Sequence, residues 1–151
     1  MKKAIFIFMI AVLAGSEVSA SGPERVTIIR TLIMEAVGDG EEAMQAVGEV
    51  IRNRMADKRW PDTAYEVVTQ PWQFSCNNGD REKNWKQFKK RNRIDGGDWM
   101  RASKAWEKSK TSNITKGSNL YHATYISAPR WDWSKVEQKA IINNHVFYQE
   151  K

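Results

Sequence analysis

The hydrophobic positions between residues 23 and 55 repeat with the period of an α-helix, in two blocks. Val26, Ile29, Ile33 and Val37 recur at intervals of three and four residues. This spacing places one apolar stripe along a helix over residues 23–37. A second and wider stripe comprises Ala43, Met44, Ala46, Val47, Val50, Ile51 and Met55. The pattern therefore predicts two amphipathic helices in succession.

The short link between these helices predicts that they pack as a hairpin. Gly38 is expected to end the first helix, because glycine accepts the left-handed conformation that is common at helix C-termini. Asp39 is expected to cap the second helix, with Glu42 three residues later completing a capping box. The hairpin would bring Glu35, at the end of the first helix, beside the start of the second.

Beyond residue 60 the pattern predicts shorter helices and then strands. Helices are expected over 63–69, 81–93 and 98–109, with a loop at 71–79 and a break at 94–97. After Gly117 the apolar period changes to two, which predicts a strand over 120–126, and 141–148 is a second β-rich run. A helical body with two or three short strands indicates a single α+β domain.

The first twenty residues have the three-part pattern of a secretory signal. Lys2 and Lys3 precede an apolar run over 4–14, and small residues up to Ala20 follow. The run is shorter than the roughly 20 residues that span a bilayer. We therefore expect a signal peptide over 1–20 and one domain over 21–151, exported to the periplasm or the cell exterior and in contact with the membrane only during export. A retained anchor and an apolar N-terminal helix are the alternatives.

The charge and the cysteine content of the chain limit the range of possible binding partners. The chain has 24 Lys and Arg against 18 Asp and Glu, a net charge of +6. Residues 81–110 alone hold 11 basic and 4 acidic residues, interleaved with Trp85, Phe88, Trp99 and Trp106. This pattern suits a single-stranded nucleic acid or an anionic glycan, and equally two amphipathic helices with solvated basic faces. Export argues against nucleic acid, and a single cysteine excludes an intramolecular disulfide framework.

Glu35 is a candidate general acid. Its neighbours in sequence, Ile33, Met34, Ala36 and Val37, are all apolar, and an apolar environment raises the pKa of a carboxyl group. A raised pKa keeps the proton available for donation at neutral pH. A solvent-facing glutamate or one paired with a nearby arginine is the alternative.

Cys76 is a candidate nucleophile, because His122 and His145 follow it in the order of a Cys/His pair. A buried structural thiol is the alternative, since residues 71–75 do not resemble the start of a helix that would lower a thiol pKa. Each histidine is interpreted as a hydrogen-bonded structural residue rather than a metal ligand. No metal or other cofactor is expected.

Four segments carry recognisable motifs in order: TLIMEAVGDGEEAMQAVGEVIRNR (31–54), RWPDTAYEVVTQPWQFSCNNGD (59–80), ITKGSNLYHATYISAPRW (114–131) and INNHVFYQ (142–149). Together they resemble the cell wall hydrolase family typified by spore-cortex-lytic enzymes. The resemblance implies a mainly helical α+β domain of the lysozyme-like or lytic-transglycosylase-like kind, with a small antiparallel β-sheet. It also implies cleavage of the glycan strand of peptidoglycan, an anionic polymer, by a monomer acting as a muramidase or lytic transglycosylase.

The same resemblance assigns site residues. Glu35 maps onto the catalytic glutamate, and substrate contacts are expected from Gln73, Phe74, Tyr121, His122, Trp131 and His145. Met34 and Val37 depart from the glycine and arginine that usually surround this glutamate. A Cys/His cell-wall peptidase using Cys76, and a non-catalytic module that binds glycan or nucleic acid, are the alternatives.

The second step of the reaction could follow either of two routes. A second carboxylate would assist water in a hydrolysis, and Asp39, Glu41, Glu42 and Asp132 are the nearest candidates in sequence. Alternatively, Glu35 would turn base and activate the muramic C6 hydroxyl, which closes an anhydro ring. The sequence favours the second ending, because no second catalytic residue stands out.

Overall fold

Two helices form the hairpin that the apolar spacing predicts. In the computed structural model, which describes residues 22–151, they are α1 (Gly22–Ala36) and α2 (Gly40–Met55). A 3-10 turn over Val37–Asp39 joins them. The signal peptide expected over residues 1–20 lies outside the described residues. Among the residues described, no helix has the length and apolarity needed to cross a membrane.

The link between these helices differs from both expectations. Gly40, and not Gly38, takes the positive backbone angle, with φ 91°. Asp39 makes no side-chain cap on α2, so the predicted capping box is wrong. The reason is competition, because the Asp39 carboxylate accepts a hydrogen bond from Asn144 Nδ2 at 2.5 Å instead.

Three further helices complete the helical body. They are α3 (Ala64–Thr69), α4 (Arg81–Asn92) and α5 (Gly96–Lys108), and a 3-10 turn over Ser75–Asn77 precedes α4. Each begins at a side-chain cap of a common kind, from Thr63, Asp80 and Asp95 respectively. The apolar faces of α1, α2, α3 and α5 meet in one core, which also buries Trp85 and Trp106. The helical interpretation of residues 81–110 is therefore correct, and Trp85 and Trp106 pack in the core.

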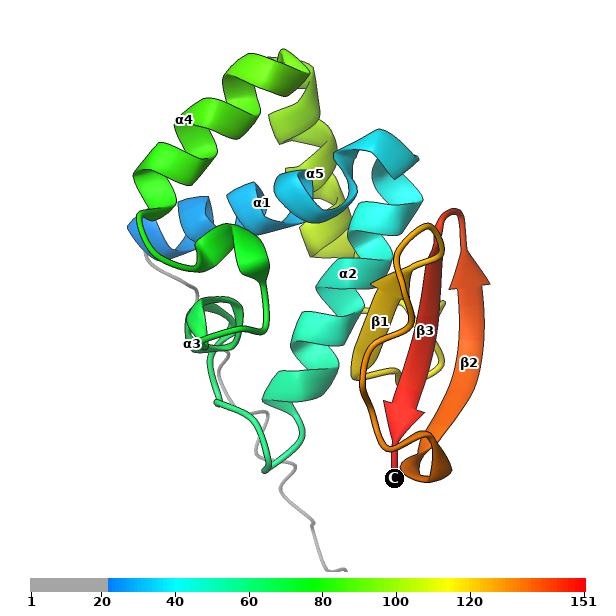
Figure 1. The fold of residues 1–151 in the computed structure, drawn as a ribbon. Coiled ribbons are helices and arrows are strands. Elements are labelled where there is room, and N and C mark those ends of the chain that lie inside the picture. The colour runs from blue at the N-terminus through cyan, green and yellow to red at the C-terminus, as the bar shows by residue number, and fades with distance from the viewer. Residues whose placement is uncertain (1–21) are drawn as a thin grey trace, which may run out of the picture.

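The sheet has three antiparallel strands in the order β1-β3-β2: β1 (Leu120–Ala123), β2 (Val136–Ile142) and β3 (His145–Glu150). Figure 1 shows the sheet on one side of α2, with α1, α3 and α4 on the other. Ala46 and Val50 of α2 pack against Ile142 and Phe147 of the sheet. The predicted α+β class, mainly helical with a small antiparallel sheet, is confirmed.

Strand boundaries differ from the sequence pattern in two places. The strand expected over 120–126 ends at Ala123, where the chain turns and the Ile126 amide bonds the Ala123 carbonyl at 3.3 Å. The β-rich run over 141–148 is two strands joined by a tight turn, in which Asn143 takes φ 50°. Asparagine accepts this conformation more readily than most residues, so the turn fits within an apparently continuous run.

A close approach of α2 to α5 supplies a stability prediction. A Cβ added at Gly48 would lie 2.9 Å from Ser109 Oγ and 3.0 Å from Ser109 Cβ. We expect Gly48→Ala to lower the free energy of unfolding by about 1–3 kcal/mol through overpacking, against a gain of about 1 kcal/mol in helix propensity. Gly38→Ala is the control, because nothing lies within 4 Å of its added Cβ. Urea unfolding of both variants measures the difference, and equal stability would contradict the close contact.

Candidate active site

Glu35 lies in the last turn of α1 and is half-buried. The Tyr121 hydroxyl donates a hydrogen bond to Glu35 Oε2 at 2.7 Å. Burial raises the pKa of the Glu35 carboxyl, and hydrogen bonds from Tyr121 and Cys76 and the charge of Arg54 partly oppose this rise. A carboxyl group that holds its proton to higher pH is suited to act as a general acid.

Tyr121 reaches Glu35 from the sheet. Its ring stacks on Phe147 of β3, with 5.7 Å between centroids, and lies 6.5 Å from the ring of Phe74. Burial, followed by the neighbouring Glu35 carboxylate, raises the pKa of the Tyr121 hydroxyl well above its ordinary value. Tyr121 therefore keeps its proton and acts toward Glu35 as a hydrogen-bond donor.

Arg54, near the end of α2, is a buried cation close enough to influence Glu35. Its Nε donates to the Asn119 carbonyl at 2.8 Å, and its guanidinium lies 4.2 Å from the centre of the Trp60 ring. Burial lowers the pKa of Arg54 to about 10, so it stays charged at neutral pH. Its Nη1 is buried, and none of the described residues accepts a hydrogen bond from it. Sequence reasoning missed this residue, although it ends the Asn-Arg motif of the second helix.

Asp39 and His145 form a pair beside Tyr121. His145 Nδ1 lies 3.4 Å from Asp39 Oδ2, and the His145 ring lies 5.6 Å from the Tyr121 ring. Burial lowers the pKa of His145, and the charge of Asp39 opposes that shift. Side-chain hydrogen bonds from Asn143 and Asn144 to Asp39 join the link after α1 to the β2–β3 turn, so they hold the sheet against the end of α1.

Cys76 contacts Glu35 rather than a histidine. Burial and the adjacent Glu35 carboxylate raise the pKa of its thiol far above the ordinary value, which makes it a poor nucleophile at neutral pH. His122 bonds the Ala123 carbonyl and the Tyr148 hydroxyl, and His145 faces Asp39. The structure therefore places neither histidine as the base of a Cys/His pair.

A substitution at Cys76 tests this arrangement. We expect Cys76→Ala to keep lytic activity within about tenfold of the wild type, since one hydrogen bond contributes about 1 kcal/mol. Turbidity loss of a peptidoglycan suspension measures the rate. Complete loss of activity in a folded Cys76→Ala protein would contradict the placement of this thiol beside, and not within, the chemistry.

The other predicted site residues fall into two groups. Phe74 is 1% exposed, so it supports the Tyr121 ring and does not present a face for stacking on a sugar, whereas Gln73 is exposed. His122 and Trp131 belong to an aromatic cluster with Trp133 and Tyr148. The centroid of the Trp131 ring lies 5.4–5.9 Å from the centroids of the other three rings. Because neighbouring residues of a strand point to opposite faces, His122 lies away from Tyr121 and Glu35. Substrate contacts of these residues stay predictions.

Three of the four carboxylates considered as a second catalytic group bond other residues, and the fourth is exposed. Asp39 is held by Asn144, and Glu41 accepts a hydrogen bond from Lys108 Nζ at 2.6 Å. Asp132 accepts from Ser134 Oγ at 2.6 Å, and Glu42 is exposed on α2. Within residues 22–151, the partners of Glu35 are Tyr121 and Cys76, with no second carboxylate among them. Over the same residues, no group of three or more acidic, histidine or cysteine side chains is arranged to hold a metal ion.

Two solved structures share this fold. The catalytic domain of the germination-specific lytic transglycosylase SleB from Bacillus anthracis is 18% identical, with a TM-score of 0.65, over 85% of this chain and 96% of that one. The catalytic domain of the Bacillus cereus SleB protein is 17% identical, with a TM-score of 0.58, over 85% of this chain and 92% of that one. Among curated proteins, none matches this sequence significantly.

A family model gives the identification. The model of the cell wall hydrolase family matches residues 38–148. The match begins three residues after Glu35, so the role of this glutamate rests on its geometry and on the four sequence motifs. The match does not favour the alternatives of a Cys/His peptidase or a non-catalytic module, and it confirms the expected class of enzyme. The chain belongs to the cell wall hydrolase family, whose substrate is the peptidoglycan outside the cytoplasmic membrane.

Proposed function

We propose that this enzyme cleaves the peptidoglycan glycan strand between N-acetylmuramic acid and N-acetylglucosamine, with Glu35 as its general acid. The observation that carries the proposal is the half-buried Glu35 carboxyl, with its raised pKa and its 2.7 Å hydrogen bond from Tyr121. Protonated Glu35 gives its proton to the glycosidic oxygen as the bond to the muramic C1 breaks. The departing sugar leaves with a hydroxyl group, and positive charge develops on the muramic ring.

Glu35 is then a carboxylate in a partly buried site. The Tyr121 hydroxyl and the charge of Arg54 both stabilise this state. The carboxylate next takes the proton of the muramic C6 hydroxyl while O6 bonds to C1, which closes a 1,6-anhydro ring and returns Glu35 to its protonated form. This ending consumes no water and needs one carboxylate. It is supported by the partners of Glu35 described above and by the lytic transglycosylase activity named for the Bacillus anthracis domain.

Product analysis in heavy-oxygen water tests the ending of the reaction. Sacculi are digested by the enzyme and the released muropeptides are examined by mass spectrometry. We expect anhydromuramic ends that carry no heavy oxygen. Reducing ends that contain heavy oxygen would overturn the transglycosylase proposal in favour of hydrolysis, and cleaved peptides with intact glycan would overturn glycan cleavage itself.

The setting follows from the substrate. We propose that residues 1–20 direct export and that residues 21–151 act as a monomer in the periplasm or the cell wall. Lysines at the start and the apolar run over 4–14 support export. Mass measurement of the protein recovered from an expressing bacterium tests this, and we expect a mature chain that begins at Ser21.

A further inference from the structure

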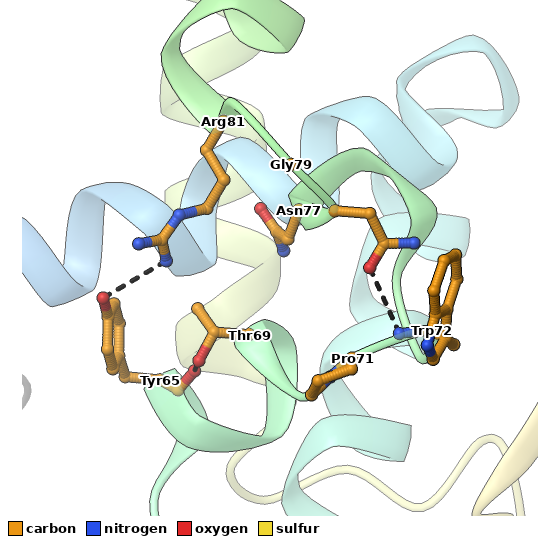
Figure 2. Close-up of a pocket in the computed structure, with 8 residues that line it drawn as sticks. Tyr65, Thr69, Pro71, Trp72, Asn77, Gly79 and Arg81 are labelled. Atoms are coloured by element: carbon orange, nitrogen blue, oxygen red, sulfur yellow. Dashed lines mark hydrogen bonds between the residues drawn. The ribbon is translucent and has the colours of Figure 1, made fainter.

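A hollow beside the catalytic region has no role in the chemistry described above. It has a volume of about 420 Å³, and its lining includes Tyr65, Trp72, Asn77, Asn78 and Arg81. Figure 2 shows Arg81 and Tyr65 at one end and Trp72 at the other. A second hollow of about 160 Å³ shares Asn77 and Arg81 with it and also includes Met34, the neighbour of Glu35 in sequence. The two hollows are therefore neighbours that share part of their walls.

Trp72 is the most unusual residue of this region. Its side chain is 85% exposed, and its backbone has φ 67°, a left-handed conformation that bulky residues rarely adopt. Such strain costs about 1–3 kcal/mol and gathers at functional sites. Asn78 Oδ1 accepts a hydrogen bond from the Trp72 amide at 3.1 Å and so fixes this conformation. The fold thus holds a large aromatic face in solvent, where burial gives it no benefit.

The opposite end of the hollow is formed by the exposed cation Arg81, which bonds Tyr65. Arg81 Nη1 donates to the Tyr65 hydroxyl at 3.2 Å, and the guanidinium lies 5.7 Å from the centre of the Tyr65 ring. Arg30 lines the second hollow, where its Nη1 pairs with the Glu82 carboxylate and its Nε is buried without a hydrogen-bond partner among the described residues. The cation left to receive a ligand carboxylate is therefore Arg81. A guanidinium held in place suits a planar carboxylate, because it offers several donors in one plane.

The hollow is physically coupled to the site of Glu35. Asn77 Nδ2 donates to Thr31 Oγ1 at 2.9 Å and to the Val68 carbonyl at 2.8 Å. Thr31 lies one turn before Glu35 on α1, and Cys76, next to Asn77, bonds Glu35 itself. A ligand seated between Trp72 and Arg81 would therefore rest on the same short segment that borders the carboxyl group.

An exposed aromatic face and a guanidinium suit a sugar that carries a carboxylate. We propose that this hollow is a second binding site, which takes a muramic acid unit of the glycan strand with its sugar face on Trp72 and a carboxylate on Arg81. The carboxylate belongs either to the lactyl group or to the peptide attached to it. The proposal rests on the proposed function for its substrate, and it adds a site that selects carboxylated strands.

Binding measurements on a protein that cannot cleave test this site. The Glu35→Gln protein is titrated calorimetrically with three tetrasaccharides: chitotetraose, a muramic acid tetrasaccharide with free lactyl groups, and the same tetrasaccharide with its peptides. Adding Arg81→Gln to this protein is expected to lower its affinity for the two carboxylated ligands about tenfold, which corresponds to losing roughly 1.4 kcal/mol of charged hydrogen bonding. Binding of chitotetraose should stay the same. If Arg81→Gln weakens binding of the ligand with free lactyl groups, the lactyl group carries the recognised carboxylate. If it weakens binding of the peptide-bearing ligand alone, the peptide carries it.

A matched control separates a specific contact from net charge. Lys86→Gln removes the same charge from an exposed position of α4 that lines neither hollow. We expect Lys86→Gln to leave all three affinities within about twofold of those of the Glu35→Gln parent, since screened surface charges contribute little to binding. Equal effects of Arg81→Gln and Lys86→Gln on the carboxylated ligands would overturn the carboxylate site.

Trp72→Gly tests the sugar platform without risk to the fold. Glycine accepts φ 67° without strain, so we expect the melting temperature to equal or exceed that of the parent protein. Affinity for all three tetrasaccharides should fall roughly tenfold with the loss of the ring. Unchanged affinity would overturn the platform. Mass spectrometry of the ligands after each titration confirms that they are intact, so these results stand apart from whether Glu35 is the general acid.

Discussion

Replacing Glu35 with glutamine is expected to reduce the rate of peptidoglycan cleavage by at least about a thousandfold, because it removes the only proton donor proposed for the leaving group. Glutamine has nearly the same shape, and its carbonyl oxygen can still accept the hydrogen bond that Tyr121 donates to Oε2 at 2.7 Å. The fold should therefore persist. Release of soluble muropeptides from sacculi, followed by chromatography, measures the rate.

The same substitution has an expected effect on stability with a definite sign. The pKa of Glu35 is raised in the folded state above its ordinary value of 4.5, so the folded protein binds this proton more tightly than the unfolded chain does. Ionised Glu35 then opposes folding, and this penalty grows as the pH rises from about 4.5 through the raised pKa. Glu35→Gln should match or exceed the wild type in melting temperature at pH 7, with the difference vanishing toward pH 4. Wild-type lysis by the folded variant would remove Glu35 from its assigned role.

Replacing Tyr121 with phenylalanine is the second large effect that we expect. The hydrogen bond from Tyr121 lowers the pKa of Glu35, so its loss should raise that pKa further. A general acid works while it is protonated, so the alkaline limb of the activity profile should move to higher pH. The rate should also fall roughly ten- to a hundredfold at every pH, because the carboxyl group loses the donor that orients it.

The pH profile of Tyr121→Phe distinguishes this role from mere support of the fold. Tyr148→Phe is the matched control, since its hydroxyl lies 3.1 Å from His122 Nε2 and belongs to the other face of the sheet. Rates measured over the pH range in which both variants stay folded should show a shifted limb for Tyr121→Phe alone. Identical profiles for the two variants would mean that Tyr121 does not tune Glu35.

Local patterns were sufficient for the helices, because the three- and four-residue spacing in α1 and α2 directly reflects the faces that they bury. For Glu35 the apolar neighbours left both a buried and a solvent-facing carboxyl open, and the resemblance to a family singled this residue out. Side chains recruited from distant segments were harder to predict. Asp39 resembles a helix cap, but Asn144, more than a hundred residues later, bonds its carboxylate. Arg54 resembles an ordinary end of an amphipathic helix, and only the fold buries it under Trp60 and near Glu35.

The strand errors have a related cause. The alternation of apolar and polar residues indicates which face of a sheet a residue would occupy, but it does not indicate where the pairing of two strands ends. Residues 141–148 are a β-rich run by composition, yet Asn143 and Asn144 turn the chain and bond Asp39 with their side chains. The sequence likewise did not reveal that Phe74 is buried, because an aromatic residue in a loop gives no sign of the partner that will cover it.

The strand order carries a consequence for how the enzyme comes into being. β3 is the last of the three strands in the chain but lies between the other two, and β1 pairs with β3 alone. A growing or emerging chain therefore holds β1 without a partner until His145–Glu150 arrive, and the same segment brings Phe147, on which the Tyr121 ring rests. Glu35, the proposed proton donor, thus gains its hydrogen bond from Tyr121 only when synthesis has passed this strand. On the proposed mechanism, an unfinished chain is therefore inactive toward the wall.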